Sequence, residues 1–147
     1  MSANKIVLNS NGLVASEEAI GSGTIKPGHL IAVTTAGAVI VHTPEGGFAE
    51  RAFATEDANQ GNTVDTSYAN GARVMYACVA PGTKVQARLA AGENVTAIGT
   101  QLISNGDGTL IALASAGSGV TVRQIIAVAM EVMNATSAEK FIAVRVL

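Results

Sequence analysis

The sequence predicts an all-β chain: a single small β-barrel or β-sandwich domain that follows an extended N-terminal arm. The clearest signal lies in residues 81–110, where short aliphatic runs alternate with glycine-bearing turns. Each run has the length of one strand. The turns at Pro81-Gly82, Gly92-Glu93-Asn94 and Asn105-Gly106-Asp107-Gly108 hold residues that tight turns favour. A length of 147 residues fits one domain with a core of its own.

Residues 1–23 form the predicted arm, and residues 24–147 form the domain. The arm is polar and rich in Gly and Ser, and its aliphatic run Ile6-Val7-Leu8 predicts one short strand. Ser16-Glu17-Glu18 is compatible with the start of a short helical turn, which the following glycines would end.

The first part of the domain is predicted to hold a hairpin, a strand and a long loop. The runs HLIAV and AVIVH flank a turn at Ala36-Gly37, which predicts a β-hairpin. Residues 48–55 alternate as expected for a strand with one partly solvent-exposed face. Residues 56–71 form a long polar loop, and such loops are often functional or mobile.

The second part of the domain continues with strands. The run RVMYACV at residues 73–79 predicts a strand, and residues 141–147 predict the closing one. Residues 122–133 contain good helix formers, but β-branched residues and alternation favour a strand. One face of that strand would hold Ile126, Val128, Met130 and Val132.

Composition argues against several classes of function. Charged residues make up 14% of the chain and the formal net charge is -2, which is no electrostatic footprint for DNA or RNA. Aromatic residues, on which bases stack, make up only 3%. A single cysteine allows no intrachain disulfide, and no apolar run reaches the ~18 residues of a membrane span. The N-terminus lacks the apolar stretch of a signal peptide, so we expect synthesis in a cytoplasm.

No pattern of reactive or metal-binding residues emerges, so we expect no enzyme activity, no cofactor and no metal. His29 and His42 flank the predicted hairpin, and a metal site needs three or four converging ligands. Cys78 lies in an apolar run and is predicted to be a small buried residue, not a nucleophile. The remaining alternative is a ligand-binding barrel, which requires a pocket that brings together His29, His42, Asp65, Tyr68 and Cys78.

Three segments of the chain resemble a known family. They are TIKPGHLIAVTTAGAVIVH at residues 24–42, GENVTAIGTQLISNGDGTLIA at 92–112, and VAMEVMNATSAEKFIAVRVL at 128–147. Their Pro-Gly hairpin, their glycine-turn pair and their closing strand resemble those of the small capsid decoration, or cement, proteins of tailed double-stranded DNA bacteriophages.

The resemblance implies a structural virion protein that binds the outside of the expanded head and stabilises it. It implies a homotrimer whose partner is the major capsid protein, with no role for nucleic acid or membrane. The mean hydropathy of +0.37 agrees with apolar area buried between subunits.

The resemblance also implies that the arm lies on the major capsid protein, where its short strand would add to a neighbouring sheet edge. The predicted contact residues are Ser2, Asn4, Lys5, Ile6, Val7, Leu8, Asn9 and Asn11. Another virion surface component, such as a head-fibre base or a tail-associated domain, is the alternative that fold and composition leave open.

Overall fold

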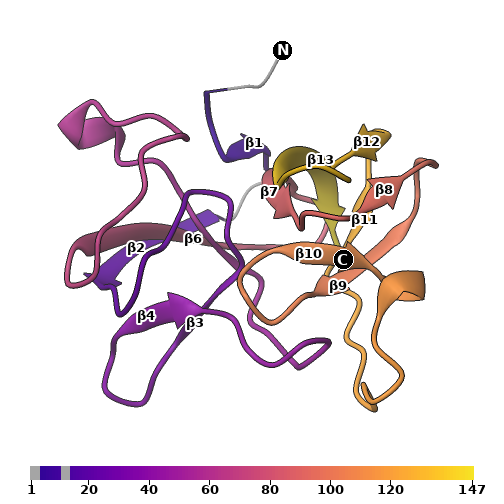
Figure 1. Cartoon of the computed structure of the whole chain (residues 1–147). Helices are drawn as coiled ribbons and strands as arrows, with labels where there is room; N and C mark the ends of the chain where they lie inside the picture. Colours follow the sequence, from indigo (N-terminus) through magenta and orange to yellow (C-terminus); the bar gives the residue numbers. More distant parts are fainter. Residues whose placement is uncertain (1–3, 11–13) are drawn as a thin grey trace.

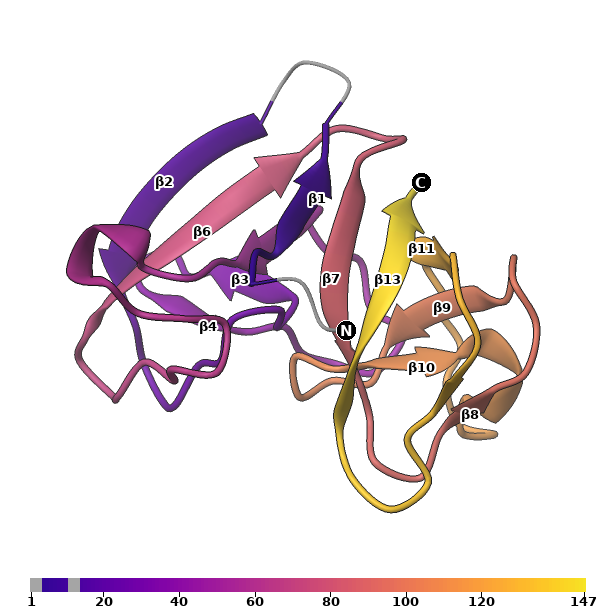
Figure 2. The same ribbon diagram turned by 90° about the horizontal axis from the view of Figure 1, so that it is seen from above.

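The computed structural model describes residues 4–10 and 14–147 of the chain (Figure 1). In this part of the chain the fold is all-β, as predicted, with thirteen strands and two single-turn 3-10 helices at Ala58–Gln60 and Leu113–Ser115. No helix within it is long and apolar enough to cross a membrane. The strands form two parts, a barrel and an outer layer, which lie side by side in Figure 2.

The barrel comes from the second half of the chain. Its strands are β7 (Lys84–Leu89), β9 (Gln101–Ser104), β10 (Leu110–Ala112), β11 (Ala127–Ala129) and β13 (Lys140–Val146). They hydrogen-bond in the order β7-β10-β9-β11-β13, and β13 also pairs with β7, so the sheet closes on itself. Closure removes the long unpaired edges that an open sheet would have.

Three short strands flank the barrel. The strand β1 (Val7–Asn9) pairs antiparallel with the start of β7. The strands β8 (Asn94–Val95) and β12 (Met133–Asn134) form a two-stranded ribbon of their own.

The outer layer comes from the first half of the chain. Its sheet has β6 (Arg73–Val79) in the middle, with β2 (Val14–Ile20) and β5 (Ala52–Ala54) antiparallel on either side. A hairpin of β3 (Ile31–Val33) and β4 (Val39–Val41) lies against this sheet. Isolated bridges from Gly21 to Val39 and from Leu30 to Phe53 join the hairpin to it.

Two buried clusters hold these parts together, and the alternation of side chains along the sheet serves both. The larger cluster fills the barrel and includes Phe53 and Ala77 from the outer layer. The smaller cluster lies between the sheet and the hairpin and includes Val74 and Tyr76. Because neighbouring residues of a strand point to opposite faces, β6 contributes to both clusters at once.

Several predicted elements are confirmed. The hairpin is β3–β4, the run 73–79 is β6, and the closing strand is β13, whose buried face holds Ile142, Val144 and Val146. Residues 122–133 are not helical, but in place of the one predicted strand they contain β11 and the start of β12, with residues 130–132 outside both. Residues 56–71 hold one 3-10 turn and otherwise form a loop.

Two local predictions are wrong. Residues 16–18 do not begin a helical turn but lie in β2, because β6 supplies pairing partners along the whole strand. The run 48–55 forms a strand only at β5, and all three residues of β5 are buried. The predicted solvent-exposed face is absent because the two clusters pack against opposite faces of β5.

Candidate functional site

The N-terminal segment, predicted to contact a capsid, contains both anchored and exposed residues. Ile6 is fully buried in the larger cluster. Its N–H donates to the Glu56 carboxylate at 3.0 Å, and its carbonyl accepts the Gln86 N–H at 2.7 Å. Val7 is half-buried, and the exposed side chains are those of Asn4, Lys5, Leu8 and Asn9.

This division limits which predicted contact residues can meet a partner. Full burial of an isoleucine side chain contributes about 1.5–3 kcal/mol, so Ile6 is held by the fold. Ser2 and Asn11 lie outside the described residues. The segment therefore offers a partner a short stretch of exposed side chains on β1 and just before it.

The two histidines have separate partners. The His42 ring contacts the Ser104 hydroxyl through Nδ1 at 2.7 Å and the Phe48 carbonyl through Nε2 at 2.9 Å. The Nδ1 atom of His29 accepts the Lys26 N–H at 3.2 Å. Both rings are almost completely buried, which fits polar residues that close the ends of the hairpin.

The other polar candidates are also dispersed. The Tyr68 hydroxyl donates to the Thr55 carbonyl at 2.7 Å, and Asp65 is exposed. Cys78 is half-buried, less than predicted, and lines an open hollow on the outer layer. In residues 4–10 and 14–147, no group of three or more His, Cys, Asp or Glu side chains is placed to hold a metal ion.

The Cys78 thiol is not activated. Burial raises its pKa, and the negative charges of Glu17 and Glu50 raise it further. A nucleophilic cysteine needs a lowered pKa in an electropositive setting, so this environment is the opposite of the one that such chemistry requires.

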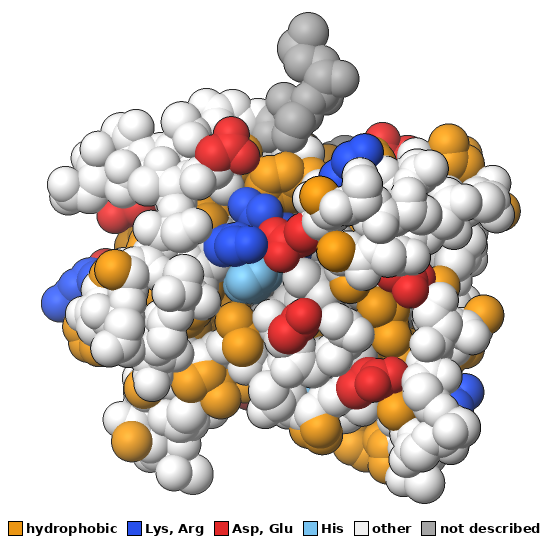
Figure 3. All heavy atoms as spheres, in the orientation of Figure 1, with side chains coloured by type: hydrophobic (Ala, Val, Ile, Leu, Met, Phe, Trp, Pro, Cys, Tyr) orange, Lys and Arg blue, Asp and Glu red, His pale blue; other side chains and the backbone are white. Residues whose placement is uncertain are grey.

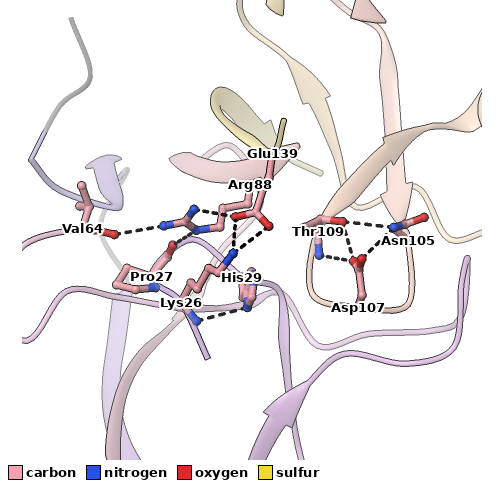
Figure 4. Close-up of polar contacts among 9 residues, drawn as sticks. All are labelled: Lys26, Pro27, His29, Val64, Arg88, Asn105, Asp107, Thr109 and Glu139. Carbon is pink, nitrogen blue, oxygen red and sulfur yellow. Dashed lines mark hydrogen bonds and ion pairs between the residues drawn. The ribbon is translucent and has the colours of Figure 1, made fainter. Parts of the chain in front are cut away.

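The most connected ionic group is one that sequence analysis did not identify (Figure 4). Glu139 accepts from Arg88 Nη1 at 2.6 Å and from Lys26 Nζ at 3.2 Å. Arg88 also donates through Nε to the Pro27 carbonyl at 2.7 Å and through Nη2 to the Val64 carbonyl at 3.2 Å. We call Lys26, Arg88 and Glu139 the clasp.

The clasp joins four segments that are far apart in the sequence. Lys26 precedes the hairpin, Val64 lies in the polar loop, Arg88 in β7 and Glu139 just before β13. The Arg88 guanidinium also lies 4.3 Å from the centre of the Phe141 ring, a cation–π contact. Because no local spacing links these residues, sequence patterns carry no signal for the group.

Charges in the clasp oppose the effect of burial. Burial alone would raise the pKa of Glu139, but hydrogen bonds and charge from Arg88 and Lys26 outweigh it and leave this pKa below its ordinary value. Glu139 therefore stays ionised at neutral pH. The arrangement orders the junction between barrel and outer layer, and all its charges are used within the chain.

His29 lies beside the clasp, under the turn that joins β9 and β10. Burial lowers its pKa from 6.5 to about 4; Glu139 opposes this shift, whereas Arg88 and Lys26 add to it. Gly108 of the turn has a φ of +88°, and a Cβ there would lie 2.9 Å from the His29 ring. Glycine is thus required at this position both for its backbone conformation and for space.

Asp107 stabilises the same turn. Burial would raise its pKa, but hydrogen bonds from Thr109 and Asn105 bring it below its ordinary value. The Thr109 N–H donates to Asp107 Oδ1 at 2.9 Å, the geometry of an Asx turn. The Asn105–Gly108 stretch is therefore a structural turn, as the sequence predicted.

The surface combines a central charged group with scattered apolar side chains. Figure 3 shows Lys or Arg, a carboxylate and a histidine gathered at the middle of one face, with hydrophobic side chains distributed around them. The most exposed large apolar residues are Phe48, Ile98 and Val132, at 79%, 68% and 59%.

Comparisons with known proteins show a shared fold. No protein-family model matches the chain, and no curated protein matches it. A solved structure that it resembles is the head fiber gp8.5 N base of bacteriophage phi29, with a TM-score of 0.57 and 13% sequence identity. The match covers 92% of this chain and 95% of that chain, so it spans both the barrel and the outer layer.

Proposed function

We propose that this chain is a structural protein of a tailed-phage virion, seated on the outside of the head as the base of a head fibre. The observation that carries the proposal is the fold likeness to a head-fibre base over almost the whole of both chains. The three segments that resemble phage decoration proteins support a head location separately, because that resemblance lies in the sequence and not in the fold.

The proposed role is one of binding and not of catalysis. The described residues form no cluster of metal-binding side chains, the Cys78 thiol has a raised pKa, and the clasp uses its charges internally. We propose that the chain acts through its surfaces, with the major capsid protein and further copies of itself, as a homotrimer, as partners.

A decoration protein is the second candidate. It is favoured by the similarity of the β3–β4 hairpin, the β9–β10 turn and the closing strand to elements of that family. The two candidates differ in occupancy: a decoration protein covers the lattice and strengthens the shell, whereas a fibre base occupies defined positions and supports a projection.

The test is localisation on virions of the phage that encodes the chain. We expect antibody against the chain to label heads, and electron cryomicroscopy of virions that lack it to show loss of density at the base of a head projection. Regular loss over the lattice, with heads that break at lower temperature, would identify a decoration protein instead. Labelling of tails only, or of no virion part, would overturn the proposal.

Oligomeric state is tested separately. Sedimentation equilibrium of the purified chain is expected to give three times the 14.8 kDa chain mass. A monomer at all concentrations would contradict the homotrimer.

A further inference from the structure

The outer strand β2 pairs with β6 along one edge, and within residues 4–10 and 14–147 its other edge has no partner strand. Its seven residues pair with β6, in a register that runs from Val14 opposite Val79 to Ile20 opposite Arg73. On β6, the Met75 carbonyl accepts from Thr55 and the Val79 N–H donates to Arg51, so odd-numbered residues of β6 bond toward β5. Even-numbered residues of β6 therefore bond toward β2, because alternate residues of a central strand serve opposite neighbours.

The register then fixes which backbone groups of β2 point outward. Ala15, Glu17 and Ala19 lie opposite Cys78, Tyr76 and Val74, and bond inward. The N–H and C=O groups of Val14, Ser16 and Glu18, which alternate with these residues, point away from the sheet.

No described residue outside β2 bonds to these outward groups. Among the described residues, the outer side of the strand is contacted at its end, where Gly21 bridges Val39 and the Ser22 N–H donates to the Val39 carbonyl at 2.8 Å. In Figure 2, β2 runs along the outer margin of the molecule. Such an edge is a template for a further strand.

Charge on this edge distinguishes between possible strands. Glu17 and Glu18 are both exposed and lie on opposite faces of β2. Glu17 accepts from the Tyr76 hydroxyl at 2.7 Å, and Glu18 pairs with Arg73 at 2.5 Å. A second copy of β2, antiparallel through Ser16 and Glu18, would place Glu17 directly opposite its own equivalent, which is destabilising.

We propose that the unpaired edge of β2 binds an extended segment of another protein that carries lysine or arginine side chains, as a fourth strand beside β5, β6 and β2. Backbone hydrogen bonds to Ser16 and Glu18 supply the affinity, and the two carboxylates select basic side chains on both faces. The inference goes beyond the proposed function and does not depend on it, because it concerns only this edge and the charge of its occupant.

The test uses the full chain, labelled with 15N, and two synthetic heptapeptides. One is Ac-Thr-Lys-Lys-Val-Lys-Lys-Thr-NH2, which carries Lys on both faces of an extended strand, and the matched control has Glu in place of each Lys. We expect the basic peptide to protect the Ser16 and Glu18 amides from hydrogen exchange, and the acidic peptide to bind at least about tenfold more weakly.

Two variants test the edge and its charge in turn. The Ser16→Pro variant removes an outward N–H and blocks the approach of a strand, so we expect loss of peptide binding, with Ser16→Ala as the control that retains it. The Glu17→Gln, Glu18→Gln double variant keeps the backbone and the acceptor for Tyr76, and we expect it to bind both peptides equally.

Three results would overturn the inference. They are equal binding of the two peptides by the unaltered chain, unchanged binding by a folded Ser16→Pro variant, and protection of the Ser16 amide that rises with chain concentration in the absence of peptide. The last would identify a second copy as the occupant. If Ser16→Pro does not fold, the double variant takes its place, because an undiminished preference of that variant for the basic peptide would contradict the proposal.

Discussion

The barrel and the outer layer differ in how the backbone groups at the edges of their strands are paired. The barrel closes β13 onto β7 and leaves its strands paired all round. The outer layer stays open: β2 has four consecutive exposed residues, from Ala15 to Glu18, and an edge that described residues engage only at its end. The closed half is suited to rigidity, and the open half to contact with a partner.

The clasp lies between the barrel and the outer layer. Substitutions in the barrel, in the clasp and at the open edge can therefore be compared for their effect on stability. Arg88 and Glu139 belong to the barrel side, whereas Lys26, Pro27 and Val64 belong to the other. If the barrel provides most of the stability, substitutions in its core should lower the free energy of unfolding most. Substitutions at the junction should lower it less, and substitutions at the open edge least.

The largest effect is expected from matched core truncations. Ile142 lies in the larger cluster and Ile25 in the smaller, and both are fully buried. We expect Ile142→Ala to lower the free energy of unfolding by about 4 kcal/mol and Ile25→Ala by about 2–3 kcal/mol, since the site beneath a hairpin can collapse more than a closed barrel. Urea unfolding measures both, and equal losses would contradict the contrast between the two halves.

Acid is expected to loosen the junction through His29. Its pKa is about 4 in the folded chain and near 6.5 when unfolded, so the unfolded chain binds the proton first as the pH falls. The free energy of unfolding should therefore drop between about pH 6.5 and 4, by roughly 3 kcal/mol. Glu139 and Asp107, whose pKa values are lowered, add stability that is lost as the pH falls further, through their folded pKa values.

Urea unfolding at a series of pH values tests this expectation, with His29→Gln as the control. The variant should lose most of the pH dependence between pH 6.5 and 5. The same slope in both proteins would show that another group is responsible.

At the clasp itself we expect a smaller loss. Replacing Arg88 by Met keeps most of the apolar stem but removes the ion pair with Glu139 and the bonds to Pro27 and Val64. Because Glu139 remains partly exposed and keeps Lys26, the loss should be about 2 kcal/mol, below that of a fully buried pair. The Glu139→Gln variant, which keeps acceptor geometry, should lose less, and the opposite order would contradict a role for the arginine as the centre of the group.

The sequence predicts those elements of the fold that depend on residues close together in the chain. Alternation and turn residues identified the β3–β4 hairpin, β6 and β13, because each depends on neighbours in the chain. Its predictions are wrong where residues far away in the sequence determine whether a segment forms a strand or is buried. The β2 strand is a strand because β6 pairs with it, and β5 is buried because two clusters enclose it.

In the N-terminal segment and the clasp, too, the features that the sequence does not predict depend on residues far apart in the chain. The N-terminal run Ile6–Leu8 predicts a short strand, but its pairing with β7 and the bonds of Ile6 to Glu56 and Gln86 come from residues far away in the sequence. The clasp joins residues 51 and 113 positions apart, beyond any pattern of spacing.

The smallest effect is expected at the open edge. Arg73 and Glu18 pair at 2.5 Å, but their side chains are 63% and 47% exposed, so water screens the interaction. We expect Arg73→Gln to change the free energy of unfolding by no more than about 0.5 kcal/mol in urea. A loss above about 1 kcal/mol would mean that the fold depends on this edge. A negligible loss would show that the ion pair between Arg73 and Glu18 is not needed for stability.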